Sequence, residues 1–205
     1  MTGVQTCALP IWLVEQVDVA EAMREIATFT PRIVEAMQAM AVRHNVNIVG
    51  ASMPVVEGER LYNEAYLLRR DGTQETQRKI HITPVEKRLW GLEGGNVLRH
   101  FRTDAGTIGI LICYDVEFPE LGRVLADRGV QILFVPSWTE TKNGYQRVRR
   151  CAQARAIENE CYVILSGSVG NLPRVENVNI HYSQSAIFSP SDFAFPHDEI
   201  GRAHV

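Results

Sequence analysis

The chain has 205 residues, of which 45% are hydrophobic and 22% charged, a composition typical of a globular α/β protein with one sizeable core. The formal net charge of -3 provides no polycationic surface for a nucleic acid, and no apolar run approaches the length that crosses a membrane. Composition therefore argues against nucleic-acid and membrane partners.

The first half of the chain predicts two helical stretches followed by strands. Apolar residues recur at helical spacing over residues 19–40, and Thr30-Pro31 is expected to supply the cap and first turn of the second stretch. A buried strand and a β-hairpin follow, because apolar runs flank the turn-forming dipeptide Asp71-Gly72. We predict these strands over residues 46–53, 61–70 and 73–80.

The second half interleaves strands with helices, which is typical of an α/β fold. No internal repeat or linker interrupts this pattern, so we expect a single domain. Strands are predicted over residues 97–101, 107–113, 131–136, 162–168 and 185–188, and helices over residues 119–128 and 146–159.

One of these strands ends abruptly on a cysteine, Cys113, inside a polar turn. Pro119 then begins an amphipathic helix, so Cys113 is expected at a strand-to-helix elbow. At such an elbow the side chain points out of the carboxyl edge of the sheet, and nearby backbone N–H groups can receive negative charge. From these residues alone, a catalytic thiol and a small buried core residue both remain open.

A lysine lies at the end of another predicted strand. This residue, Lys79, is followed by Glu86 in a proline-containing loop. The structural alternatives are a strand-end lysine that reaches solvent, and an exposed loop carboxylate that pairs locally with Lys87 or Arg88. His81 suggests a Cys-His dyad, but we expect it to form structural hydrogen bonds instead.

Together these segments resemble the nitrilase superfamily of carbon–nitrogen hydrolases. The lysine motif falls on Lys79, the nucleophile motif on Cys113 and a supporting glutamate on Glu86. Further matches lie at residues 134–137 and 154–159. The resemblance covers nearly all of residues 12–198. It implies an α/β fold, the nitrilase-like α-β-β-α sandwich truncated at both ends, with no cofactor and no metal, and a homodimer of the intact protein.

The resemblance also implies a role for each matching residue. Cys113 would attack the carbonyl carbon of a small-molecule amide, and the Lys79 ammonium and the backbone N–H of Tyr114 would hold the oxyanion. Glu86 would orient Lys79 rather than accept the thiol proton. The candidates for lining the substrate pocket, just beyond the next strand, are Trp138 and Thr139.

The general-base glutamate of the family, which follows an early strand in a Pro-Glu context, has no counterpart upstream of the lysine. Glu15 lacks both the buried strand and the Pro-Glu turn before it. Residues 1–11 and 199–205 resemble a translated sequencing adapter, so we expect artefactual tails there. The hydrolase domain is then a partial one, residues 12–198, and we expect this fragment to be inactive.

The remaining cysteines and arginines are interpreted as structural. Cys7 falls in a predicted tail, and the other three cysteines lack metal-ligand spacing, which favours reduced thiols in a cytoplasmic protein. Of these three, Cys151 and Cys161 are expected to be packing residues. A basic cluster on the last predicted helix is interpreted as a solvated face and contains Arg147, Arg149 and Arg150.

The favoured function is thiol-dependent hydrolysis of a non-peptide carbon–nitrogen bond through a cysteine thioester. A linear amide is the expected substrate class, and Glu86-Lys87-Arg88-Leu89-Trp90 partly resembles N-carbamoyl amide hydrolases. Two alternatives remain open. One is a catalytically inactive binding or regulatory module with the nitrilase fold, and the other is transfer of the acyl group to an acceptor other than water.

Overall fold

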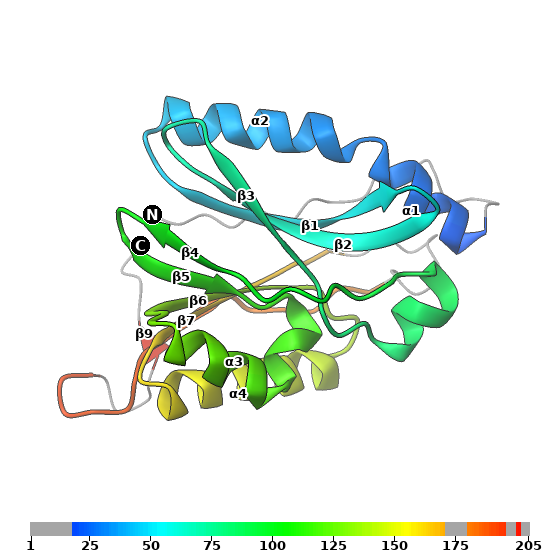
Figure 1. Cartoon of the computed structure of the whole chain (residues 1–205). Helices are drawn as coiled ribbons and strands as arrows, with labels where there is room; N and C mark the ends of the chain where they lie inside the picture. The colour runs from blue at the N-terminus through cyan, green and yellow to red at the C-terminus, as the bar shows by residue number, and fades with distance from the viewer. Residues whose placement is uncertain (1–17, 171–179, 196–199, 202–205) are drawn as a thin grey trace. The chain divides into compact units, whose positions relative to one another are not determined.

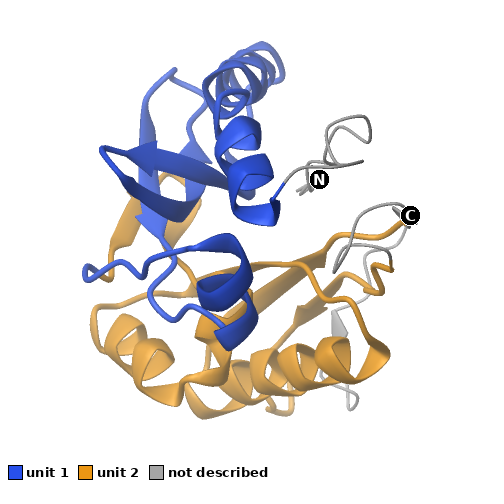
Figure 2. Ribbon diagram, turned by 90° about the vertical axis from the view of Figure 1, so that its right-hand side faces the viewer, with its two compact units in different colours: residues 1–97, 172–176 blue, residues 98–171, 177–205 orange. Residues whose placement is uncertain are grey.

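The computed structural model describes residues 18–170, 180–195 and 200–201. They belong to two compact units, blue and orange in Figure 2, which are described in turn. Unit 1 comprises residues 1–97 and 172–176, and unit 2 comprises residues 98–171 and 177–205. The predicted N-terminal tail, Cys7 and Glu15 lie outside the described residues, whereas the structure describes part of the predicted tail at residues 199–205 as the short strand β9 (Ile200–Gly201). The prediction of one domain over residues 12–198 stays a prediction.

Unit 1 contains two helices and a three-stranded antiparallel sheet of order β1-β2-β3 (Figure 1). A π-helical turn, η2, follows the last strand. The elements are α1 (Val19–Ala27), α2 (Thr30–Arg43), β1 (Ile48–Glu57), β2 (Arg60–Leu68), β3 (Gln74–Arg78) and η2 (Glu86–Trp90). Lys79 therefore directly follows β3, as predicted, and Glu86 begins η2.

Helix α2 packs on this sheet through its apolar face. Val34 and Ala41 from the helix join Met53, Tyr66 and Leu68 from the strands in one buried cluster. The helical periodicity of the sequence predicts this apolar face of α2. Its removal from water on packing stabilises the fold of unit 1.

The expected cap of α2 is wrong. Phe29 occupies the N-cap position and makes no side-chain capping bond. The hydroxyl of Thr30 instead donates to the carbonyl of Pro54 at 2.8 Å. This buried bond ties α2 to β1, so the threonine serves tertiary packing rather than the helix end.

The hairpin between β2 and β3 forms at the predicted dipeptide. Asp71 Oδ1 accepts from the N–H of Thr73 at 2.9 Å, a local side-chain turn. Gly72 adopts a φ of 90°, in the left-handed region that glycine tolerates best. The turn chemistry read from the sequence is therefore confirmed.

Unit 2 contains a six-stranded sheet of order β4-β5-β6-β7-β8-β9. The neighbours β5, β6 and β7 run parallel, and the other pairs are antiparallel. Helices α3 and α4 lie along one face of this sheet (Figure 1). The elements are β4 (His100–Thr103), β5 (Gly106–Ile110), η3 (Cys113–Glu117), α3 (Pro119–Asp127), β6 (Ile132–Ser137), α4 (Lys142–Glu158), β7 (Tyr162–Gly167), β8 (Ala186–Phe188) and β9 (Ile200–Gly201).

Two boundaries in unit 2 differ from the prediction and concern the site. The strand expected over residues 107–113 ends at Ile110, and Cys113 begins the 3-10 helix η3. The helix expected from residue 146 begins at Lys142, because Thr141 Oγ1 accepts from the N–H of Gly144 at 3.0 Å and caps it. The α/β class is confirmed. Among the helices of the described ranges, none is long and apolar enough to span a bilayer.

Candidate active site

Lys79 and Glu86 form a buried ion pair in unit 1. Lys79 is 1% exposed and Glu86 is 8% exposed. Lys79 Nζ donates to Glu86 Oε1 at 2.6 Å and to Oε2 at 2.7 Å. The alternatives of a solvent-reaching lysine and an exposed loop carboxylate are therefore wrong.

Thr83 fixes the carboxylate of Glu86. The Thr83 N–H donates to Glu86 Oε2 at 2.8 Å, and the Glu86 N–H donates to Thr83 Oγ1 at 3.2 Å. These two reciprocal hydrogen bonds form a capping box. Pro84 follows Thr83 in the first helical turn, where a backbone N–H has no partner within the helix and a proline is therefore tolerated. The spacing of Thr83 and Glu86 is a sequence signal that would have revealed this arrangement.

Main-chain bonds hold Lys79 on both sides. Its N–H donates to the carbonyl of Asn63 at 2.8 Å, and its carbonyl accepts from the N–H of Gly95 at 2.7 Å. At the neighbouring Gly94, a Cβ would come within 2.4 Å of the carbonyl oxygen of Ile80. The backbone around the lysine is therefore closely packed, which limits where the ammonium can lie.

Cys113 occupies the elbow of unit 2 between β5 and α3. Its φ is 49°, a left-handed conformation that costs about 1–2 kcal/mol for a residue with a Cβ. The thiol is partly buried, and Sγ donates to the carbonyl of Trp138 at 3.5 Å. The predicted strand-to-helix elbow is thus present in unit 2. Backbone strain of this kind is concentrated at functional sites.

The other predicted residues of unit 2 surround the ends of η3 and β6. The ring of Tyr114 packs edge-on against Phe118, with centroids 5.0 Å apart. Trp138 and Thr139 directly follow β6, and the indole lies 4.9 Å from the ring of His181. The hydroxyl of Thr139 donates to the carbonyl of Tyr182 at 2.8 Å. Trp138 is therefore the pocket candidate that the structure brings into contact with Cys113.

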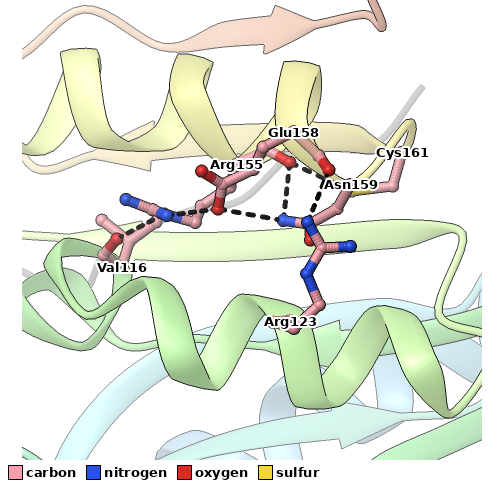
Figure 3. A network of polar contacts seen from close by, with 6 residues as sticks. All are labelled: Val116, Arg123, Arg155, Glu158, Asn159 and Cys161. Carbon is pink, nitrogen blue, oxygen red and sulfur yellow. Dashed lines mark hydrogen bonds and ion pairs between the residues drawn. The ribbon is translucent and has the colours of Figure 1, made fainter.

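A buried arginine supports the elbow from α4 (Figure 3). Arg155 Nε donates to the carbonyl of Val116, inside η3, at 3.1 Å. The same guanidinium pairs with Glu158, whose carbonyl accepts from Arg123 Nη2 at 2.9 Å. At Gly122 in α3 a Cβ would lie 2.9 Å from Arg155 Cδ, so this glycine leaves space for the arginine. Sequence analysis missed this support, because helical spacing gives no sign of a partner on η3.

The thiols of unit 2 differ in their surroundings. Burial raises the pKa of Cys161 to about 11. Burial also raises the pKa of Cys151, with the charge of Glu117 as the second cause. A raised pKa reduces the thiolate fraction, so both residues fit the predicted packing role. In the part of the chain that the structure describes, no cluster of three His, Cys, Asp or Glu side chains could hold a metal ion.

Comparisons with known proteins show the family of this chain. The carbon–nitrogen hydrolase family matches residues 1–191. The chain belongs to this family. A probable hydrolase of Bacillus subtilis, YhcX, is 52% identical over 179 residues, which cover 87% of this chain and 35% of that protein. A deaminated glutathione amidase of Synechocystis is 35% identical over 185 residues, covering 82% of this chain and 66% of that protein.

Solved structures extend the comparison to the fold. A mutant of the Nesterenkonia AN1 amidase from the nitrilase superfamily aligns with a TM-score of 0.72 at 23% identity, covering 86% of this chain and 66% of that one. Another structure of that amidase carries the acetamide moiety of fluoroacetamide covalently on its active-site cysteine. The predicted nitrilase-like fold is confirmed. The chain spans 35% and 66% of the lengths of the two curated relatives.

The structure thus brings the predicted site residues into two groups, one in each unit. Lys79 and Glu86 bond to each other in unit 1. Cys113 and Trp138 bond to each other in unit 2, with Tyr114 next along η3.

Proposed function

We propose that the parent protein is a thiol amidase that hydrolyses a non-peptide carbon–nitrogen bond in a small linear amide. The observation that carries the proposal is the strained elbow, where Cys113 begins η3 beyond the carboxyl end of β5. The 35% identity to a deaminated glutathione amidase supports an amide rather than a nitrile as the substrate class. A carbamoyl amide is one form of this substrate.

In the proposed first step, the thiolate of Cys113 forms a bond to the carbonyl carbon of the amide. The carbonyl oxygen becomes an oxyanion, which the Lys79 ammonium and the backbone N–H of Tyr114 stabilise. Such preorganised donors contribute roughly 3–4 kcal/mol each to a transition state.

The second half of the proposed reaction releases the products. The carbon–nitrogen bond breaks, ammonia or an amine leaves with a proton, and Cys113 remains as a thioester. Water then adds to the thioester, the acid departs, and the thiol is regenerated. Glu86 orients Lys79 throughout, and we assign Trp138 and Thr139 to the wall of the substrate pocket.

A general base is not among these assignments. No glutamate upstream of Lys79 stands in a Pro-Glu context after a strand. We therefore propose that this chain alone turns over no amide, because loss of one member of a cooperative catalytic unit removes most of the rate.

The test is ammonia release from a panel of amides by the protein encoded by the intact gene. Cys113→Ala should lower the rate by about four orders of magnitude or more, as for loss of other catalytic nucleophiles. Cys151→Ala, a matched thiol on α4, should retain the rate. Activity that survives Cys113→Ala would contradict the proposed nucleophile.

The same assay separates the alternative functions. Added hydroxylamine should yield a hydroxamate from the thioester, whereas water alone should yield the acid. An acyl product that forms only with a non-water acceptor would favour acyl transfer. An intact protein that binds amides without any turnover would favour the binding module.

We also propose a reducing, cytoplasmic setting and a homodimer of the intact protein. The described cysteines Cys113, Cys151 and Cys161 are not joined in disulfides, which supports the first proposal. Light scattering of the intact protein tests the second, with a mass of one protomer as the contradicting result.

A further inference from the structure

A second ion pair lies at the far end of the cysteine elbow. Glu117 is the last residue of η3, the short helix that Cys113 begins. Its carboxylate is 14% exposed and accepts from Arg147 Nε of α4 at 2.8 Å, while the arginine side chain is 59% exposed. One helical element therefore carries a thiol at its start and a mostly buried carboxylate at its end, with a cation across from the carboxylate.

The arginine is within electrostatic reach of the thiol. The hydrogen bond to Glu117 raises the pKa of Arg147 above its ordinary value, and negative charge on Glu117, Cys113 and Tyr114 acts in the same direction, against the effect of burial. Because the attraction between two charges is mutual, the guanidinium favours the thiolate of Cys113 in turn. The carboxylate of Glu117 opposes that thiolate.

Other charged and titratable groups also lie around η3. Arg155 of α4 is bound to Val116 and Glu158. Burial raises the pKa of Cys151 on the same helix, so this thiol carries little charge near neutrality. Asp115, within η3 itself, is a third such group, and it is buried, with 1% of its surface exposed.

We propose that the Glu117–Arg147 pair balances charge at the elbow and thereby sets how readily Cys113 ionises. Arg147 and Glu117 act through Cys113 and are positioning residues, not catalytic ones. Without the guanidinium, a carboxylate at the end of η3 would disfavour the thiolate that attacks the amide. The inference rests on the proposed function only in treating Cys113 as the nucleophile.

The three arginines of the basic cluster on α4 have different surroundings in the structure. Their spacing in the sequence predicts one solvated face made of Arg147, Arg149 and Arg150. Arg149 instead lies over the ring of Phe188, 4.9 Å from its centroid, and Arg150 is exposed. Of these three, Arg147 is the one that forms an ion pair with η3, through Glu117, so Arg150 provides a matched control of equal charge on the same helix.

The experiment measures alkylation of Cys113 by iodoacetamide at neutral pH and low salt, in the chain as it exists, with modified peptides quantified by mass spectrometry. The rate reports the thiolate fraction. Arg147→Gln should slow alkylation about two- to fivefold. A change of one unit in the pKa of Cys113 would change the rate about tenfold, and the effect is smaller because solvent screens a partly exposed pair. Glu117→Gln should accelerate it by a similar factor.

Two comparisons guard against a merely structural effect. The double variant Arg147→Gln/Glu117→Gln should return close to the wild-type rate, and Arg150→Gln should leave it unchanged. All differences should shrink in 1 M salt, because screening weakens charge interactions and leaves packing intact. A structural disturbance would instead move both single variants in the same direction, and that result, or an equal effect of Arg150→Gln, would overturn the inference.

The alkylation readout is independent of turnover. If the intact protein keeps its amidase activity in Cys113→Ala, the proposed function fails while opposite alkylation shifts still support charge balance at the elbow. If activity is lost in Cys113→Ala but the two shifts have the same sign, the proposed function stands and this inference fails.

Discussion

The two ion pairs at the candidate catalytic residues differ in exposure far more than in distance. Lys79 Nζ lies 2.6 Å from Glu86 in a fully buried setting of unit 1, whereas Arg147 Nε lies 2.8 Å from Glu117 in unit 2, with the arginine 59% exposed. A buried charge that loses its partner is costly, but an exposed one is stabilised by water. We therefore expect the Lys79–Glu86 pair to stabilise the fold of unit 1. The Glu117–Arg147 pair can change the ionisation of Cys113 with little effect on the stability of unit 2.

The largest effect is expected from breaking the buried pair on one side only. Glu86→Gln leaves the Lys79 ammonium buried beside a neutral amide, so the free energy of unfolding of unit 1 should fall by about 3–5 kcal/mol. Urea denaturation, with hydrogen exchange of the β2 and β3 amides to isolate unit 1, measures the loss.

Two controls sharpen this result. The exposed Arg60–Glu93 pair, at 3.6 Å in the same unit, should tolerate Glu93→Gln with no measurable loss of stability. Lys79→Met/Glu86→Leu removes both buried charges together and should lose less stability than Glu86→Gln. If the single and double variants are equally unstable, the cost comes from packing and the comparison of the pairs fails.

The next effect concerns the arginine that supports the elbow. Arg155→Met leaves the Val116 carbonyl without this donor and Glu158 without its buried cation, which should cost unit 2 about 2–3 kcal/mol. Arg123→Met removes only the bond to the carbonyl of Glu158 and should cost about 0.5 kcal/mol. Hydrogen exchange of the α4 and η3 amides distinguishes the two. Equal losses would mean that the elbow does not depend on Arg155.

These contacts also mark the limit of sequence reasoning. Local signals sufficed where neighbours in sequence determine the structure, as at the Asp71-Gly72 turn and the elbow at Cys113. They failed where the partner is distant or the element irregular. The neighbours Lys87 and Arg88 suggested a local ion pair for Glu86, but its carboxylate binds Lys79.

Irregular elements and long-range partners account for the other differences. The apolar run before Cys113 predicted a strand to the cysteine itself, whereas η3 begins there and the ladder of β5 ends at Ile110. A run of apolar residues is buried in either conformation, so hydrophobicity alone does not locate this change. The role of Arg147 depends on a carboxylate 30 residues earlier in the chain, which helical periodicity does not encode.

A smaller effect should arise from the backbone strain of the elbow. Cys113→Gly relieves the left-handed conformation and should be about 1 kcal/mol more stable than Cys113→Ala, which keeps a Cβ. Glu160, exposed and also left-handed with a φ of 50°, provides the matched control, since Glu160→Gly should gain a similar amount without touching the site. Thermal unfolding compares the variants, and an elbow glycine no more stable than alanine would contradict stored strain.

The smallest effect on stability is expected at the exposed pair. A double-mutant cycle of Arg147→Gln and Glu117→Gln should give a coupling of about 0.2–1 kcal/mol, because solvent screens the exposed guanidinium. The same substitutions should nevertheless move the alkylation rate of Cys113 in opposite directions. A coupling as large as that of the buried pair would show that both pairs serve structure. A small coupling with opposite reactivity shifts would separate the pair that holds the fold from the pair that sets the charge of the thiol.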